Sequence, residues 1–141
     1  MEILSRLLLL SALSLVTVVH AADLPRSESP DGAKAYIISP KDGETVGSKV
    51  TVKFGLKGMG VSPAGLRKKN TGHHHLIVDG KQMPAFNKPM GKDVMHFGGG
   101  QTEKTVELSP GKHTLQLILG NHLHIPHNPP VISEKITINV K

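Results

Sequence analysis

The chain has no cysteine and no tryptophan, and only one tyrosine and three phenylalanines among its 141 residues. Without cysteine, disulfides cannot stabilise the fold, and a metal site must use histidine, methionine or carboxylate ligands. Bases stack on aromatic rings in many nucleic-acid-binding proteins, and the small number of such rings here argues against that class of protein. The net charge of +6 is carried mainly by scattered lysines, with one basic cluster at Arg67-Lys68-Lys69. We therefore expect a solvated basic surface suited to an anionic cell envelope.

A long hydrophobic run is also lacking. The uncharged apolar stretch from Leu7 to Val19 has about 13 residues, whereas about 20 are needed to span a bilayer. Arg6 precedes this stretch and two alanines follow it. The pattern predicts a cleaved export signal over residues 1–21, so that the mature protein begins near Ala22, is periplasmic or secreted, and has no transmembrane segment. The alternative is that the stretch is retained as an N-terminal anchor.

No stretch of ten or more residues has the 3.6-residue hydrophobic period of an amphipathic helix. Ten prolines and 15 glycines instead separate short segments in which apolar and polar residues alternate. In the clearest segment, residues 48–58, the side chains of Val50, Val52 and Phe54 face one side of a strand. Similar alternation predicts strands within five further segments, which are residues 33–40, 73–80, 101–108, 113–120 and 131–141.

These segments predict an all-β fold, a single antiparallel β-sandwich of six to seven short strands, immunoglobulin-like in scale, over residues 34–141. About 120 residues suffice for one hydrophobic core but hardly for two, so we expect a single domain and a monomer. The polar, proline-containing residues 22–33 predict a flexible leader. The alternating apolar faces should bury enough surface for the domain to fold without metal or disulfides.

Histidine is abundant where cysteine is absent. Eight of the nine histidines fall between residues 73 and 127, at predicted strand ends or in loops. Two of them, His73 and His75, share one face of a strand about 6.5–7 Å apart, so that one ion about 2 Å from each nitrogen could join them. We predict that three segments contribute to a solvent-accessible imidazole cluster. The predicted metal ligands are His73, His75, His96, His124 and His127.

Two further histidines are expected to have structural roles. His74 points away from its two neighbours and has the same parity as Leu76, so we expect it at the margin of the core. His113 opens a strand whose next inward residues are leucines, and the same argument applies to it. Both imidazoles are expected to hydrogen-bond to backbone groups.

Methionine offers a second kind of ligand. Met95 adjoins His96 and is therefore a secondary candidate ligand. His122 is a further secondary candidate. Imidazole suits Cu(II), Zn(II) and Ni(II), and thioether suits Cu(I), so the bound ion is expected to be copper or zinc. Met59 and Met83 are interpreted as apolar side chains that fill gaps in the packing.

Signals of an enzyme are missing. None of the serines lies in a G-x-S-x-G turn, and the chain has no G-x-x-x-x-G-K-[ST] phosphate loop. Asp79 and Asp93 are the only carboxylates expected near the histidines. Asp79 precedes a glycine and is interpreted as a turn residue. Asp93 is either an outer partner that orients His96 or a solvated loop residue.

Long ordered motifs carry a resemblance to a known family. The segments "GHHHLIVD", "HFGGGQTE", "PGKHTLQLILG", "HIPHNPPV" and "SEKITINV" resemble a bacterial exported family catalogued as domain of unknown function 4399. The opening "ISPKDGETV" fits the same family, so that the resemblance extends from about Ala33 to the C-terminus. It implies a compact β-sandwich exported to the cell envelope, and it implies no activity. The family pattern has histidine at the positions matching His73, His74, His75, His96, His113, His124 and His127.

Two functions of different classes remain open. The first is a periplasmic metal-binding protein, most plausibly for copper, that acts as a buffer, carrier or sensor. The second is an envelope module without metal, whose loops contact a partner protein or cell-wall glycan.

Overall fold

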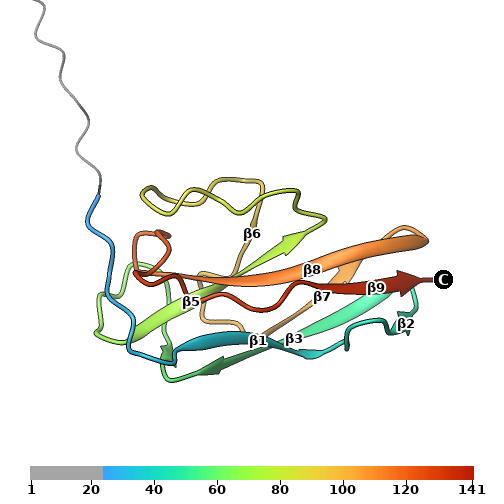
Figure 1. The fold of residues 1–141 in the computed structure, drawn as a ribbon, viewed down its shortest axis with the longest axis horizontal. Helices are drawn as coiled ribbons and strands as arrows, with labels where there is room; N and C mark the ends of the chain where they lie inside the picture. The colour runs from blue at the N-terminus through green and yellow to red at the C-terminus, as the bar shows by residue number, and fades with distance from the viewer. Residues whose placement is uncertain (1–23) are drawn as a thin grey trace, which may run out of the picture.

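The computed structural model describes residues 24–141, which form two β-sheets without any helix (Figure 1). The export signal expected over residues 1–21 lies outside the described residues. Within the described part of the chain, there is accordingly no helix of the length and apolar character needed to cross a membrane.

The smaller sheet has three antiparallel strands in the order β1-β3-β7. In its central strand Val50, Val52 and Phe54 are buried, whereas Lys49 and Thr51 on the other face are exposed, as expected from the alternation of the sequence. The strands are β1 (Lys34–Ser39), β3 (Lys49–Lys57) and β7 (Glu103–Glu107).

The larger sheet has the order β2-β9-β8-β5-β4, and β6 pairs with another part of β5. Its three long strands are antiparallel, but β2 pairs with β9 and β4 pairs with β5 in parallel. The expectation of a purely antiparallel fold is therefore wrong for these two pairs, each two residues long. The strands are β2 (Thr45–Val46), β4 (Gly60–Val61), β5 (Thr71–Val78), β6 (Met95–His96), β8 (Gly111–Gly120) and β9 (Ile136–Val140).

All six segments predicted as strands contain one. The described residues have nine strands rather than six to seven, because β2, β4 and β6 are two-residue strands. A two-residue strand is too short to show an alternation of apolar and polar residues, so that these three could not be recognised from sequence.

The main core lies between the two sheets and makes the fold sandwich-like. Buried side chains of the smaller sheet, such as Val52 and Phe54, pack in one cluster with those of the larger sheet, such as Leu117 and Ile138. These apolar faces remove the inner surfaces of both sheets from water, which is the main stabilising contribution to such a fold.

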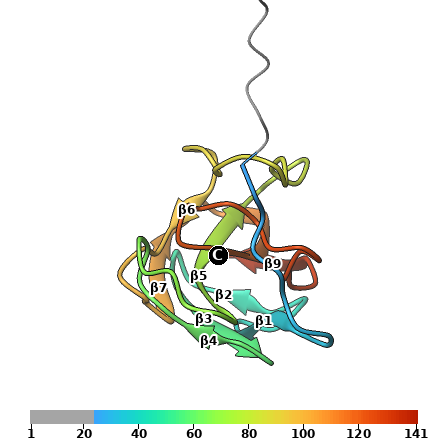
Figure 2. The same ribbon diagram turned by 90° about the vertical axis from the view of Figure 1, so that its left-hand side faces the viewer.

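A second apolar layer covers the outer face of the larger sheet. The long loop between β5 and β6 runs over that face (Figures 1 and 2). Its Val94 packs with Ile77 of β5 and Ile118 of β8, and three partly buried side chains of the loop, Met83, Phe86 and Met90, pack against them. The outer face of β5 is consequently buried as well, and this decides the environment of the histidines.

The stretch predicted to be a flexible leader is hydrogen-bonded to the domain at residues 26–29. The backbone N–H of Ser29 donates to Asn128, and that of Asn128 donates to Ser27. The Arg26 guanidinium donates to the carbonyl oxygens of Pro126 and His127. Residues 26–29 therefore lie along residues 126–129, beside the loop that carries His124.

Candidate metal centre

Strand β5 presents its three histidines to opposite faces of the larger sheet. His73 lies opposite Gly120 of β8 and His75 lies opposite Ile118, so these two side chains lie on the outer face. His74 points inward, where its ring centroid lies 5.3 Å from that of Phe54 in the main core. The predicted i, i+2 relationship is confirmed, because the rings of His73 and His75 are 4.7 Å apart between centroids.

Two other segments bring imidazoles to the same place. Strand β6 pairs with β5 so that His96 lies opposite His75. The loop after β8 brings His124, which has a positive φ of 63°. The side-chain oxygen of Asn121 accepts hydrogen bonds from the backbone N–H groups of Leu123 and Ile125 and thereby shapes that turn.

The four rings converge on one point. Each of His73, His75, His96 and His124 offers a nitrogen, and these nitrogens lie within 4.8 Å of one another. Nitrogens about 2.1 Å from a shared ion are at most about 4.2 Å apart. In a tetrahedral set such nitrogens are about 3.4 Å apart, so the widest pair would move together by roughly 0.6–1.4 Å, depending on the geometry of the ion.

The cluster is more enclosed than the sequence predicts. His73 and His75 are fully buried, with 0% and 1% of their surface exposed, because the β5–β6 loop covers this face of the sheet. His96 is exposed and His124 is intermediate. The expectation of a solvent-accessible cluster therefore holds only for these last two, which leave the site open on one side.

Two buried ring nitrogens of the cluster have no hydrogen-bond partner. Nε2 of His73 lies 3.0 Å from Nδ1 of His124, and one of these two nitrogens donates to the other. Nδ1 of His73 and Nδ1 of His75 are buried without any partner. Buried polar atoms are nearly always paired in folded proteins, so these nitrogens are exceptional, as are those of His74 and Nδ1 of His127 outside the cluster.

Burial and mutual repulsion favour the neutral form of His73, His75 and His124. The pKa of His75 is lowered to about 3 and that of His73 to about 4. Burial is the largest cause of both shifts, and the neighbouring imidazoles are the second. The pKa of His124 is lowered by burial and by His96. Neutral imidazole is the form that binds metal ions, so that the folded chain holds these side chains ready for coordination.

Two glycines leave the space that the rings occupy. A Cβ atom on Gly120 would lie 2.6 Å from Cε1 of His75, and one on Gly98 would lie 2.4 Å from Cε1 of His96. Real Cβ atoms do not come so close to ring atoms, so a side chain at either position would displace a predicted ligand. The Gly98-Gly99-Gly100 run thus includes a residue that positions His96.

The fifth predicted ligand, His127, does not join the cluster. Its ring is buried, and its Nε2 donates to the carbonyl oxygen of Thr71 at 3.1 Å. Its neighbour in the loop, His122, is also outside the cluster of four and lines a separate pocket. The loop before β9 therefore contributes one of its three histidines to the cluster.

The methionine beside the site differs from the one predicted. Met95 lies opposite Leu76, and since successive residues of a strand face opposite sides, it points away from the face of His96. Met90 lies closer to the rings. Its methyl carbon is 3.0 Å from the position that a Cβ on Gly120 would take, beside His75. Met59 and Met83 pack against the two apolar clusters, in agreement with their interpretation as gap-filling residues.

The two histidines with expected structural roles differ in their hydrogen bonds. His113 donates from Nε2 to the carbonyl oxygen of Ser109 at 2.8 Å, as predicted, and its Nδ1 lies 2.7 Å from Asp79. For His74 the prediction of a backbone hydrogen bond is wrong, because both of its ring nitrogens are buried without a partner. Burial lowers the pKa of His74 to about 4, whereas the Asp79 hydrogen bond raises that of His113.

Neither candidate carboxylate belongs to the cluster of ligands. Asp79 has a positive φ of 53° at the end of β5 and accepts a hydrogen bond from the backbone N–H of Thr114, as fits a turn residue. Asp93 is exposed in the β5–β6 loop. Within residues 24–141, the converging ligand set is therefore made of imidazoles alone.

Comparison with known proteins identifies a family and no close relative. The model of a family described as a domain of unknown function (DUF4399) matches residues 52–141. Neither a curated protein nor a solved structure matches the chain. The matched region includes the four converging histidines and both glycines that adjoin them.

Proposed function

This chain belongs to the family described as a domain of unknown function (DUF4399), and we propose that it binds one transition-metal ion as a buffer or carrier in the cell envelope. The observation that carries this proposal is the convergence of four ring nitrogens within 4.8 Å, supplied by β5, β6 and the loop after β8. Three separate segments place imidazoles at one point, and two of the buried rings have nitrogens without partners. A bound ion would take one nitrogen from each ring, because a bare imidazole nitrogen is a metal ligand.

Copper or zinc suits this site best. Four imidazoles provide nitrogen ligands and no negative charge, which disfavours magnesium and calcium, since both prefer oxygen. Cu(II) and Zn(II) both accept such a set, and we propose copper because a methionine, Met90, lies beside His75 and thioether sulfur suits the reduced ion. The open side at His96 and His124 gives the ion a path in and out.

The immunoglobulin-like arrangement and the location are part of the same proposal. Two sheets packed on a shared core agree with a sandwich of that kind. Export rests on the predicted signal over residues 1–21. N-terminal sequencing of protein extracted from the envelope should give a start near Ala22, and an intact Met1 would refute the cleavage.

Metal titration of the purified protein is the experiment that tests the binding. We expect one equivalent of Cu(II) or Zn(II) to bind at micromolar concentration or tighter, as followed by calorimetry. Replacing His124 with Asn, a residue that tolerates its positive φ, should weaken binding at least about tenfold. Replacing His122 with Asn is the matched control, because His122 is in the same loop but outside the cluster.

The alternative function is an envelope module that contacts a partner protein or glycan without metal. A protein that takes up neither ion at micromolar concentration would support this alternative. Equal losses of affinity in the two asparagine variants would also contradict the proposed site, because the ion would then bind to exposed histidines in general.

A further inference from the structure

A second site lies at the same end of the molecule. The leader, the segment between β4 and β5, and the loop after β8 line a pocket of about 810 Å³. This volume is within the range of pockets that bind small molecules. The pocket shares none of the four converging histidines, since its two imidazoles are His122 and His127.

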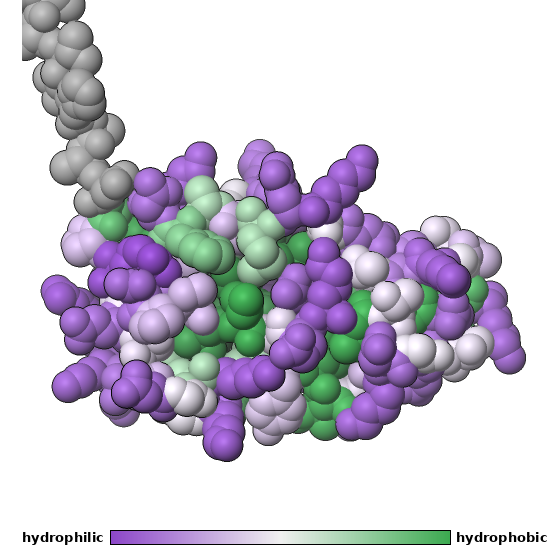
Figure 3. All heavy atoms as spheres, viewed as in Figure 1, coloured by the Kyte–Doolittle hydropathy of each residue, from purple (hydrophilic) through white to green (hydrophobic). Residues whose placement is uncertain are grey.

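The lining of this pocket carries an excess of positive charge. It contains Arg26, Arg67, Lys68 and Lys69 against a single carboxylate, Glu28. Within residues 24–141, the cluster at residues 67–69 forms no ion pair with a carboxylate. In the surface view, hydrophilic side chains are spread over the visible face, this end included (Figure 3). Three consecutive cations without counterions create a local positive potential that a bound anion would neutralise.

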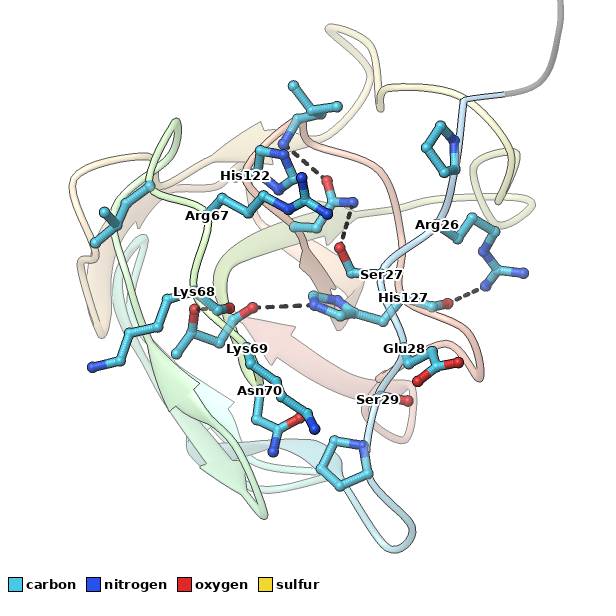
Figure 4. A pocket seen from close by; sticks show the side chains of 16 residues that line it. Arg26, Ser27, Glu28, Ser29, Arg67, Lys68, Lys69, Asn70, His122 and His127 are labelled. Carbon is cyan, nitrogen blue, oxygen red and sulfur yellow. Dashed lines mark hydrogen bonds between the residues drawn. The ribbon is translucent and has the colours of Figure 1, made fainter.

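The positive side chains are arranged around an opening. Figure 4 shows Arg67 extending toward His122 and Lys69 lying beside Asn70 on the side of Ser29, whereas Lys68 points away from these residues. Arg67 and Lys69 therefore flank the pocket from the β4–β5 side. A guanidinium and an ammonium placed in this way suit a phosphate, because the first binds two oxygens at once and the second adds a compact charge.

The opposite wall is held in place and offers polar groups. Arg26 is occupied by the carbonyl oxygens of Pro126 and His127, so it fixes the leader rather than facing a ligand. The Ser27 hydroxyl accepts a hydrogen bond from the Asn121 side chain at 3.1 Å, which leaves its own hydrogen available. The docked leader thus converts an exposed basic segment into a pocket with a donor on its far wall.

We propose that this pocket binds a phosphate-bearing anion, with Arg67 and Lys69 as the principal contacts. The phosphate belongs either to a soluble molecule or to a lipid headgroup of the envelope. Neither source changes the chemistry of recognition, and the experiment below separates them. The site is independent of the metal ion, and its presence does not depend on the outcome of the metal titration.

The test uses metal-free protein, so that phosphate cannot bind to an ion in the imidazole cluster. Inorganic phosphate is titrated while the backbone amide resonances of the protein are followed by nuclear magnetic resonance. In parallel, sedimentation measures binding to phosphatidylcholine vesicles containing about 30% phosphatidylglycerol, which imitate an anionic membrane surface. We expect resonance shifts at residues 27–29 and 67–70 with phosphate, sedimentation of the protein with vesicles, or both.

Charge-matched variants decide between a site and a general effect of net charge. The double variant Arg67→Ala/Lys69→Ala should lower the affinity at least about tenfold. The control Lys53→Ala/Lys57→Ala removes the same charge from exposed positions of β3 and should change it less than about twofold. Response to phosphate alone assigns a soluble ligand, and response to vesicles alone assigns a lipid. The proposal is overturned if neither probe binds, or if both double variants lose affinity equally.

Discussion

Acidification should unfold the metal-free protein between about pH 6.5 and pH 4. Burial lowers the pKa of His73 and His74 to about 4 and that of His75 to about 3, whereas an unfolded histidine titrates near 6.5. As the pH falls, the unfolded chain therefore binds protons before the folded chain does, and the free energy of unfolding decreases. Each of these three fully buried rings lowers the free energy of unfolding of the protein by on the order of 3 kcal/mol across this window.

The combined loss is comparable to the whole stability of a small domain, about 5–15 kcal/mol. His113 works in the opposite direction, because its raised pKa adds stability as the pH falls toward 6.5, and this contribution is constant below 6.5. One histidine with a raised pKa cannot offset three buried histidines whose pKa values are lowered. Circular dichroism of the metal-free protein as a function of pH gives the midpoint of unfolding.

Replacement of His74 with Leu isolates one of these contributions. Leucine removes a titrating ring and two unpartnered nitrogens from a site that already packs on Phe54. The variant should be more stable at neutral pH by about 1–3 kcal/mol and should unfold at a lower pH. Replacement of His113 with Gln is the control, which should not lower the midpoint. Metal-free protein that stays fully folded at pH 4 would contradict the account.

Replacing His73 and His75 together with Ala should abolish metal binding and should also destabilise the fold. The sequence places these two histidines at the end of a strand, which predicts that they have no part in the core and that their loss leaves the fold intact. The structure leads to a different expectation, because both are fully buried beneath the β5–β6 loop. Removing two buried rings leaves a cavity and should cost a few kcal/mol per ring.

The outer pair of ligands separates binding from stability. The double variant His96→Ala/His124→Asn removes two ligands that are at least partly exposed, so it should lower the metal affinity at least about a hundredfold. Its stability should stay within about 1 kcal/mol of the parent protein. Calorimetric metal titration and urea unfolding measure the two effects. A His96→Ala/His124→Asn variant that binds metal normally would contradict the assignment of the ligands.

Local patterns were sufficient to predict the framework of the site. Alternation located the six longer strands, and parity placed His73 and His75 on one face and His74 on the other. What alternation cannot reveal is which loops meet at the end of a sheet. The pairing of β6 with β5 brings His96 opposite His75, and it depends on a two-residue strand without a recognisable pattern.

The burial of the histidines was predicted less well than the faces of the sheet to which their side chains point. A β5–β6 loop rich in proline and glycine suggests an exposed connection, yet its apolar residues Met83, Phe86 and Val94 cover the outer face of β5. Their spacing has no regular period, so no pattern in the sequence distinguishes a covering loop from a solvated one. Similarly, Asn121 shapes the turn that carries His124, and the ring of His127 bonds instead to the backbone of Thr71, which the spacing of the histidines alone does not show.

The central claim is that one ion is held by four imidazoles, and X-ray absorption at the metal edge tests it most directly. Protein loaded with one equivalent of Cu(II) or Zn(II) should show four nitrogen neighbours at about 2.0 Å, with the multiple scattering that imidazole rings produce. In protein loaded with Cu(I), an additional neighbour at the longer metal–sulfur distance would add Met90 to the set of ligands. An ion surrounded mainly by oxygen, with two imidazoles or fewer, would contradict the claim.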